Sequence, residues 1–305
     1  EVTGHGGQVF FGNSGAEANE CAIKLARKFG GRGRHTVVSA LGSFHGRTLA
    51  TLAATGQPAK HEPFAPMPEG FKHVAFGDLD ALRGAVDGTV AAVLIEPIQG
   101  EGGVNPAPEG YLRGVRQLCD DVGALMIVDE IQTGLARTGT WFAFEQSGLT
   151  GDAAPDVVTI AKALGNGVPV GACWARGEVA GVFQPGDHGS TYAATALAGA
   201  VVGAVLAELR KIDAPTLAAR RGARLTELLL ALPQIESVRG AGLMLGAELV
   251  AGLDSHAVYR EALDRGLVIN AVTGSTLRFL PPLTVSDDEL AEGVAILAAV
   301  LEDLA

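Results

Sequence analysis

Continuous apolar runs alternate with segments of helical periodicity along the first part of the chain. The runs predict β-strands at residues 8–11, 35–40, 91–97, 124–130, 156–162 and 171–175. Several are unbroken stretches of Val, Ile and Leu, as is typical of strands covered on both faces of a sheet. The pattern therefore predicts an α/β fold built on a largely parallel sheet.

Helical periodicity is clearest between residues 17 and 29. The apolar stripe of this segment consists of Ala18, Ala22, Leu25 and Phe29. Ser14 and Glu17 have the spacing of a capping box at its start. A second helix is expected over residues 110–123, where Gly123 marks its end.

The pattern of apolar and polar residues changes after a long helix expected at about residues 193–211. Shorter mixed runs follow, with helices expected at about 255–265 and 286–303. We find no repeat, low-complexity segment or Gly/Ser linker. The pattern predicts a large domain at residues 1–211 and a smaller α+β domain at residues 212–305.

Composition narrows the class of protein. Of 305 residues, 48% are hydrophobic and 19% are charged, as in a densely packed enzyme. The formal charge of −11 argues against nucleic acid or an anionic membrane as the main partner. The longest uncharged apolar stretch, residues 193–207, is short for a bilayer span. The three cysteines, Cys21, Cys119 and Cys173, form no CxxC pair, so we expect buried free thiols and a cytoplasmic location.

The first candidate for chemistry is Lys162, which ends the apolar run 156–162 and precedes a glycine-rich bend. An ammonium group at the edge of a core is costly unless it is paired or neutralised. Lys162 is therefore either a surface residue whose amine reaches water or a reactive amine, and the run alone favours the surface interpretation.

The segment "FFGNSGAEANE" predicts a strand, a tight turn and the start of a helix. Free N–H groups at a helix N-terminus, together with the helix dipole, form an anion site. Gly15 permits close backbone approach and Ser14 supplies a hydroxyl. An ordinary capped turn explains the segment equally well, because it matches neither the P-loop nor the GxGxxG pattern.

Asp129 is expected at the carboxyl end of a buried strand, where ligands of open α/β sheets bind. A buried carboxylate there needs a cationic or hydrogen-bonding partner. Gln132 adds an amide to the same edge. A structural carboxylate that holds loop amides remains an equal alternative.

The three features together match the needs of pyridoxal phosphate: a lysine amine, an acid for the pyridine nitrogen and a phosphate site. In "SFHGRTLA", Phe44 can stack on a flat ring and Arg47 can bind a carboxylate through two N–H groups. Alone, such a Phe is more often a core residue and such an Arg is more often solvated.

Seven motifs occur along the chain in this order: "NSGAEANE", "SFHGRT", "EPIQGEGGV", "DEIQTGLARTG", "TIAKALGNG", "HGSTY" and "LRFLPPL". Together they resemble the class III aminotransferases of pyridoxal phosphate fold type I, over nearly the whole chain. Within that class the resemblance is greatest to the acetylornithine aminotransferases. It implies a large domain with a mostly parallel seven-stranded sheet flanked by helices, and a small C-terminal α+β domain.

The resemblance also implies pyridoxal 5′-phosphate as cofactor, and no metal. The positions that match cofactor-binding positions are Ser14, Gly15, Ala16, Phe44, Asp129, Gln132, Lys162 and Thr191. Lys162 matches the catalytic lysine that forms the Schiff base, and Asp129 matches the partner of the pyridine nitrogen. Gln132 matches a neighbour of the ring hydroxyl, and Phe44 matches the stacking aromatic residue. The turn 14–16 matches the phosphate site.

Four further residues match substrate-binding positions in the family. Arg47 and Arg278 match two arginines that bind carboxylates, and Glu101 matches an acid that pairs with or releases Arg278. Ser190 and Thr191 match a pair that reaches into the site of the neighbouring subunit. The resemblance therefore implies a homodimer with shared sites.

The implied reaction converts N-acetylornithine and 2-oxoglutarate into N-acetylglutamate 5-semialdehyde and glutamate. Alternatives within the class act on ornithine, succinylornithine, 4-aminobutyrate or an acylated lysine. A lysine aldolase would explain Lys162 but not the phosphate turn or Asp129. A different kind of alternative is a non-catalytic remnant that folds and binds cofactor without turnover.

The sequence departs from the family pattern in two places. Family members begin earlier, so we interpret the chain as a fragment without the N-terminal segment that helps close the pocket and the dimer. In addition, Ala193 and Ala194 stand in a stretch that is Gly-Gly-Asn-Pro in the family. Alanine adopts positive φ less readily than glycine, so we expect a shifted loop there.

Overall fold

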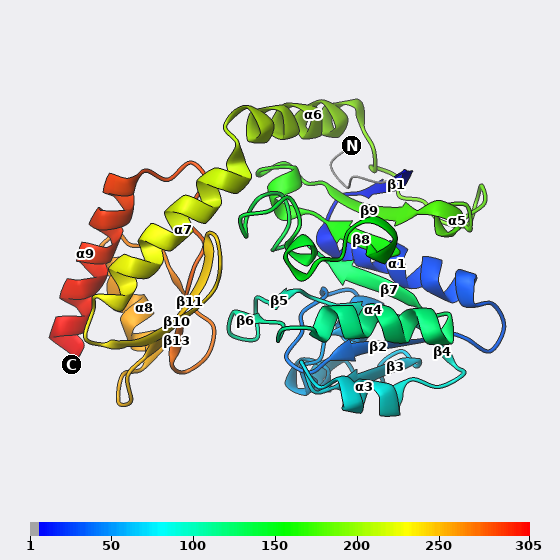
Figure 1. Ribbon diagram of the computed structural model, residues 1–305, viewed down its shortest axis with the longest axis horizontal. Helices are drawn as coiled ribbons and strands as arrows, with labels where there is room; N and C mark the ends of the chain where they lie inside the picture. The colour runs from blue at the N-terminus through cyan, green and yellow to red at the C-terminus, as the bar shows by residue number, and fades with distance from the viewer. Residues whose placement is uncertain (1–5) are drawn as a thin grey trace.

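A seven-stranded sheet forms the larger part of the molecule in the computed structural model, which describes residues 6–305 (Figure 1). Its strands, in spatial order, are β1 (Gly7–Gly12), β9 (Gly171–Arg176), β8 (Val157–Ile160), β7 (Leu125–Asp129), β4 (Val90–Ile95), β2 (Thr36–Ala40) and β3 (Phe71–Val74). β3, β2, β4, β7 and β8 pair in parallel, whereas β9 runs antiparallel to both β8 and β1. The predicted largely parallel sheet is confirmed.

Alternate residues of each strand point to opposite faces of the sheet. Both faces are covered, because the two sets of side chains pack into two different cores. Met126 and Val128 of β7 pack in one core, and Leu125 and Ile127 pack in another. Helices that contribute to one or other core are α1 (Gly15–Gly30), α2 (Leu49–Ala54), α3 (Leu79–Ala85), α4 (Tyr111–Val122) and α5 (Gly177–Ala180). This double cover explains the unbroken apolar runs of the central strands.

α1 is the helix that carries the candidate phosphate turn. The Ser14 hydroxyl caps it by accepting a hydrogen bond from the Glu17 amide at 3.2 Å. The Glu17 carboxylate accepts from the Asn13 amide, so the Ser14–Glu17 half of the predicted capping box is formed and the reciprocal bond goes to the residue before the cap. Three residues of the expected stripe are buried, but Phe29 is 41% exposed, so its assignment to the stripe was wrong. Phe29 lies in the last turn, beyond the cover of the sheet.

A pair of long helices connects the larger part to the C-terminal part. α6 spans Ala196–Lys211 and α7 spans Ala214–Leu230, and Figure 1 shows them in sequence between the two parts. α6 begins three residues later than expected, because the Thr195 hydroxyl caps it by accepting from the Ala198 amide at 3.2 Å. Just before that cap, Ala194 adopts a left-handed conformation with φ of 53°.

The C-terminal part contains a four-stranded antiparallel sheet. Its strands, in spatial order, are β10 (Ile235–Ala241), β11 (Met244–Leu249), β13 (Thr276–Phe279) and β12 (Asn270–Ala271). α7, α8 (Ser255–Asp264) and α9 (Asp287–Leu304) pack with it around a separate apolar core. The expected α+β architecture of the C-terminal part is confirmed. We propose the boundary between residues 211 and 212 as the division into domains.

Smaller elements complete the structure. A two-stranded sheet joins β5 (Ile98–Gln99) to β6 (Asn105–Pro106). Short 3-10 helices occur at Pro58–Lys60, Glu62–Phe64, Ala143–Ser147, Gly151–Ala153 and Lys162–Leu164. All three cysteines are buried free thiols, as expected. Over residues 6–305, no helix is both long enough and apolar enough to cross a membrane.

Candidate active site

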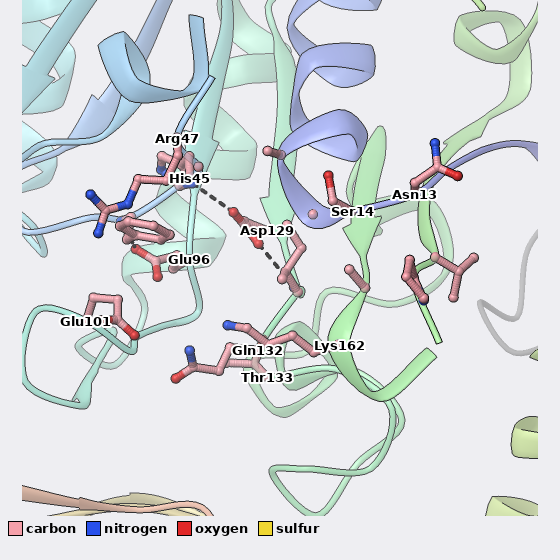
Figure 2. A pocket seen from close by; sticks show the side chains of 18 of the residues that line it. Asn13, Ser14, His45, Arg47, Glu96, Glu101, Asp129, Gln132, Thr133 and Lys162 are labelled. Atoms are coloured by element: carbon pink, nitrogen blue, oxygen red, sulfur yellow. Dashed lines mark hydrogen bonds and ion pairs between the residues drawn. The ribbon is translucent and has the colours of Figure 1, made fainter. Parts of the chain in front are cut away.

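The candidate residues come together where the parallel strands end. Segments that follow β1, β2, β4, β7 and β8 line a cavity of about 440 Å³ at this edge of the sheet. Nine predicted site residues line it: Ser14, Gly15, Ala16, Phe44, Arg47, Glu101, Asp129, Gln132 and Lys162. Figure 2 shows Lys162 reaching into this space from one side, with Asp129 above it and Gln132 close by.

Asp129 is the last residue of β7 and is buried at the base of the cavity. Its Oδ2 accepts hydrogen bonds from His45 Nδ1 and Asn19 Nδ2, each at 2.8 Å. Its Oδ1 accepts from the Ile131 amide at 3.1 Å. Three donors therefore fix one carboxylate in a pocket where an unpartnered charge would be costly.

A second carboxyl group, Glu96, is buried beside this assembly and also lines the cavity. Its two oxygens accept from the amides of Phe44 at 3.2 Å and Gly100 at 3.4 Å. Burial raises the pKa of Glu96 to about 7, with His45 opposing and Asp129 reinforcing the shift. Glu96 therefore connects two cavity-lining loops and titrates near neutral pH.

Lys162 follows β8 and has left-handed backbone geometry, with φ of 39°. A side chain in this region costs about 1 kcal/mol, and such strain is concentrated at functional sites. Its accessible surface opens onto the cavity, although protein atoms surround the amine closely. This desolvation lowers the pKa of Lys162 below its ordinary value of 10.5, and Asp129 and Glu101 oppose the shift. Lys162 is not a snorkelling surface residue.

The turn between β1 and α1 places backbone amides at the opposite wall from Arg47 and Glu101 (Figure 2). A Cβ on Gly15 would lie 2.9 Å from Ile131 Cδ1 and 3.0 Å from its Cγ2, so a larger residue here would displace Ile131. Ile131 itself lines the cavity as an apolar wall. The amides at the start of this 16-residue helix can bind an anion.

Phe44 and Arg47 lie on the loop that follows β2, and both line the cavity. The Arg47 guanidinium lies 5.4 Å from the centroid of the Phe44 ring, within the range of a cation–π interaction. Arg47 is exposed, so its charge is open to a ligand.

Arg278 lies on β13, behind the wall that Glu101 and Gln132 form. Its Nη1 donates to Glu101 Oε1 at 2.7 Å and to Gln132 Oε1 at 3.2 Å. Its Nη2 donates to Asn270 Oδ1 at 2.9 Å. Burial raises the pKa of Glu101, but the hydrogen bond and charge of Arg278 outweigh it and leave that pKa below its ordinary value. Glu101 thus covers Arg278 on the cavity side.

Ser190 and Thr191 are exposed and do not belong to the lining of this cavity as the structure describes it. Ser190 Oγ accepts from Asn13 Nδ2 at 3.1 Å, next to the candidate phosphate turn. Their predicted contribution to a neighbouring subunit stays a prediction.

Sequence reasoning missed Asn19, His45 and Glu96, which support or flank the predicted residues, and Asn270, which contacts Arg278. His45 lies between Phe44 and Arg47 in a motif that was already singled out. Its position in that motif was an available signal. Asn19 and Glu96 also lie inside quoted motifs, "NSGAEANE" and "EPIQGEGGV", whereas Asn270 lies in none of the seven.

The fold and the lysine–aspartate site in the cavity define the class of protein. The chain belongs to the class-III aminotransferases: the family profile "Aminotransferase class-III" matches residues 1–301. It is therefore an aminotransferase, and enzymes of this family use pyridoxal phosphate as cofactor.

Curated relatives narrow the comparison. An acetylornithine aminotransferase from Corynebacterium efficiens is 48% identical over 300 residues, which cover 97% of this chain and 72% of the relative. Another from Methanothermobacter thermautotrophicus is 45% identical over 301 residues, covering 97% of this chain and 75% of that protein.

Solved structures agree on the fold. The ornithine aminotransferase from Toxoplasma gondii superposes with a TM-score of 0.92 at 33% identity, covering 99% of this chain and 74% of that one. That structure is described as having partial occupancy of PLP at its active site. N-acetylornithine aminotransferase from Stenotrophomonas maltophilia gives a TM-score of 0.81 at 37% identity, covering 97% and 75% of the two chains.

Proposed function

We propose that this aminotransferase transfers the distal amino group of N-acetylornithine to 2-oxoglutarate, giving N-acetylglutamate 5-semialdehyde and glutamate, a step of arginine biosynthesis. The observation that carries the proposal is the presence of two arginines in different states. Arg47 is exposed at the cavity, whereas Arg278 forms an ion pair with Glu101, which lines the same cavity. The sequence relatives named above support this donor.

The residues fit pyridoxal phosphate. The cavity of about 440 Å³ lies within the usual size of small-molecule sites. Asp129 faces it as a buried carboxylate, and the turn 14–16 offers amides and the Ser14 hydroxyl to a phosphate. Phe44 and Ile131 supply apolar surface for a flat ring, and Gln132 supplies an amide.

When bound, pyridoxal phosphate supplies an electron sink for the carbon that loses its proton. The task of Lys162 is to hold the cofactor and then to move a proton at its Nζ. Because desolvation lowers the pKa of Lys162, more of the amine is neutral at physiological pH than in water. A neutral amine can act as nucleophile and as base, which a permanent ammonium cannot.

Asp129 would keep a proton on the pyridine nitrogen. Its three hydrogen bonds from His45, Asn19 and the Ile131 amide fix the carboxylate in one orientation. An oriented acceptor in a dry pocket interacts more strongly than the same group in water.

Two substrates with different carboxylates use the site in turn. Arg47 would bind the α-carboxylate of the amino donor, because its guanidinium is open to the cavity. Arg278 would bind the second carboxylate of 2-oxoglutarate after Glu101 withdraws. While Glu101 stays paired, the neutral pair suits the donor, which has no second carboxylate.

The acylated donor fits better than free ornithine. The α-ammonium of ornithine would need an acid, but the acids that line the cavity are already engaged. Asp129 bonds to His45 and Asn19, and Glu101 bonds to Arg278. Glu96 accepts two backbone amides. An acylated nitrogen carries no charge and removes the problem.

We also propose that the enzyme is a cytoplasmic homodimer in which Ser190 and Thr191 serve the partner's site, Thr191 at the phosphate and Ser190 at the substrate. Their exposure and their place beyond the lining of their own cavity support this arrangement. Free cysteines and an acidic composition support the location.

The test is a comparison of amino donors with 2-oxoglutarate as acceptor. We expect kcat/KM for N-acetylornithine to exceed that for ornithine by at least roughly tenfold, and Arg47→Lys to remove much of that rate because a point charge cannot reproduce the guanidinium fork. Ornithine is the second candidate donor, since the Toxoplasma gondii structure superposes well. Equal efficiency, or a preference for ornithine or 4-aminobutyrate, would contradict the proposed donor.

A further inference from the structure

Arg278 owes its position to the register of the C-terminal sheet. In the antiparallel pairing of β12 with β13, Asn270 lies directly opposite Arg278. In the pairing of β11 with β13, Gly246 lies opposite Arg278 on the other side. Directly opposite residues place their side chains on the same face of a sheet. Asn270 is therefore the cross-strand side chain that accompanies Arg278.

The glycine on the other side makes room for the loop that carries Glu101. A Cβ on Gly246 would lie 2.9 Å from Val104 Cβ and 3.3 Å from the Gly103 carbonyl oxygen. The loop can therefore rest against β11, with Glu101 in front of Arg278. Register thus gives Arg278 one permanent neighbour, Asn270, and one neighbour on a separate loop, Glu101.

The two neighbours differ in charge. In the part of the chain that the structure describes, the side chains that accept from Arg278 are one acid, Glu101, and two neutral amides, Gln132 and Asn270. If Glu101 withdraws, Asn270 Oδ1 still holds Nη2, while the positive charge of Arg278 is unbalanced. An acid at position 270 would hold the guanidinium equally well but would keep it neutralised.

We propose that Asn270 is a specificity-determining positioning residue, which holds Arg278 through a neutral acceptor so that its charge is available to the second carboxylate of a dicarboxylate acceptor. The inference rests on the proposed function, in which Arg278 serves 2-oxoglutarate and Arg47 serves the amino donor. Asn270 acts through Arg278 and only on the half reaction that uses the dicarboxylate.

The decisive variant is Asn270→Asp, which keeps size and acceptor geometry but adds a charge. We expect its KM for 2-oxoglutarate to rise at least roughly tenfold with kcat within about twofold. The single-turnover rate with N-acetylornithine should stay within about twofold. Asn270→Ala, which leaves the charge free but removes the acceptor, should raise the same KM by about threefold. Ala251→Asp, an exposed turn position, is the control for an added charge.

A binding measurement separates this inference from the choice of donor. Glutarate is an unreactive dicarboxylate, and titration calorimetry of the holoenzyme should show its affinity fall roughly tenfold in Asn270→Asp but not in Ala251→Asp. Unchanged glutarate affinity and KM in Asn270→Asp, or equal losses in both half reactions, would overturn the inference. A wild-type enzyme that prefers another donor, yet shows this glutarate pattern, would overturn only the proposed donor.

Discussion

Ala194 is strained at the level of a single residue. Its φ of 53° lies in the left-handed region, where a Cβ costs roughly 1–2 kcal/mol relative to glycine. Ala194→Gly should therefore raise the free energy of unfolding by roughly 0.5–1 kcal/mol, since the greater freedom of unfolded glycine offsets part of the gain. Chemical denaturation measures the change.

The neighbouring alanine provides the matched control. Ala193 does not have positive φ, so Ala193→Gly should lower the free energy of unfolding by roughly 0.5–1 kcal/mol. If both variants were destabilised to the same extent, the result would contradict a left-handed conformation at Ala194.

Glu96 gives a prediction about pH. Its pKa of about 7 in the folded protein is higher than the ordinary 4.5, so the folded state binds the proton more tightly. The stability contributed by that proton is complete below pH 4.5 and is lost as pH rises to about 7. The side chain introduced by Glu96→Gln cannot ionise. The difference in unfolding free energy, variant minus wild type, should therefore increase by roughly 2 kcal/mol between about pH 5 and pH 8.

Denaturant titrations at several pH values test this prediction. Glu109→Gln, at an exposed position, is the matched control for the loss of one carboxyl group. A difference between Glu96→Gln and wild type that stays constant with pH would show that Glu96 titrates alike in the folded and unfolded states.

At this scale, sequence reasoning finds residues whose function leaves a local signal. Lys162 and Asp129 end apolar runs, and the turn around Gly15 follows one, so their types are conspicuous. His45 and Asn19 act on Asp129 across long sequence separations, and either could equally be an ordinary buried polar residue. Their motifs mark them as candidates, but only the folded structure shows that both donate to Asp129.

The loop between β5 and β6 gives a prediction at the level of elements, because one arginine binds it to the C-terminal sheet. Arg239 of β10 donates to the Gly103 carbonyl oxygen from Nε at 3.0 Å and from Nη2 at 2.7 Å. The same guanidinium donates to Glu248 at 2.8 Å and to Thr276 at 2.9 Å. The loop that carries Glu101 is therefore fixed to the sheet that carries Arg278.

Arg239→Lys should loosen this loop, since the single nitrogen of an ammonium cannot reproduce four hydrogen bonds donated from three separate guanidinium nitrogens. We expect faster amide hydrogen exchange over residues 101–105 and a kcat/KM lower by several-fold. Arg224→Lys, at an exposed position on α7, is the control. Exchange at 101–105 that matches wild type would mean that other contacts fix the loop.

Elements were predictable where burial imposes a pattern on the sequence. The central strands β4, β7 and β8 are covered on both faces and appear as apolar runs. β3 was missed because it is an edge strand, "FKHV", with a mixed, partly exposed pattern. α7 was missed because its stripe is interrupted by arginines and small residues. Elements at the edge of a sheet or between the two parts are stabilised by packing against distant segments, and the local sequence does not show this.

The whole molecule is proposed to be a dimer, and this has its own test. Mixing Lys162→Ala chains with Thr191→Ala chains should restore part of the activity, because each hybrid dimer contains one site that carries neither lesion. Mass spectrometry must first confirm that subunits exchange. Hybrids that never exceed the activity of either parent would show that Thr191 serves its own chain.

The central claim is that the cavity at the carboxyl edge of the sheet is the transaminase site and that Lys162 holds the cofactor there. The most direct measurement is borohydride reduction of the protein loaded with pyridoxal phosphate, followed by peptide mass mapping. We predict that the cofactor mass is found on the peptide containing Lys162, and that N-acetylornithine added before reduction abolishes this labelling. Labelling of another lysine, or labelling of Lys162 that persists after N-acetylornithine is added, would contradict the account.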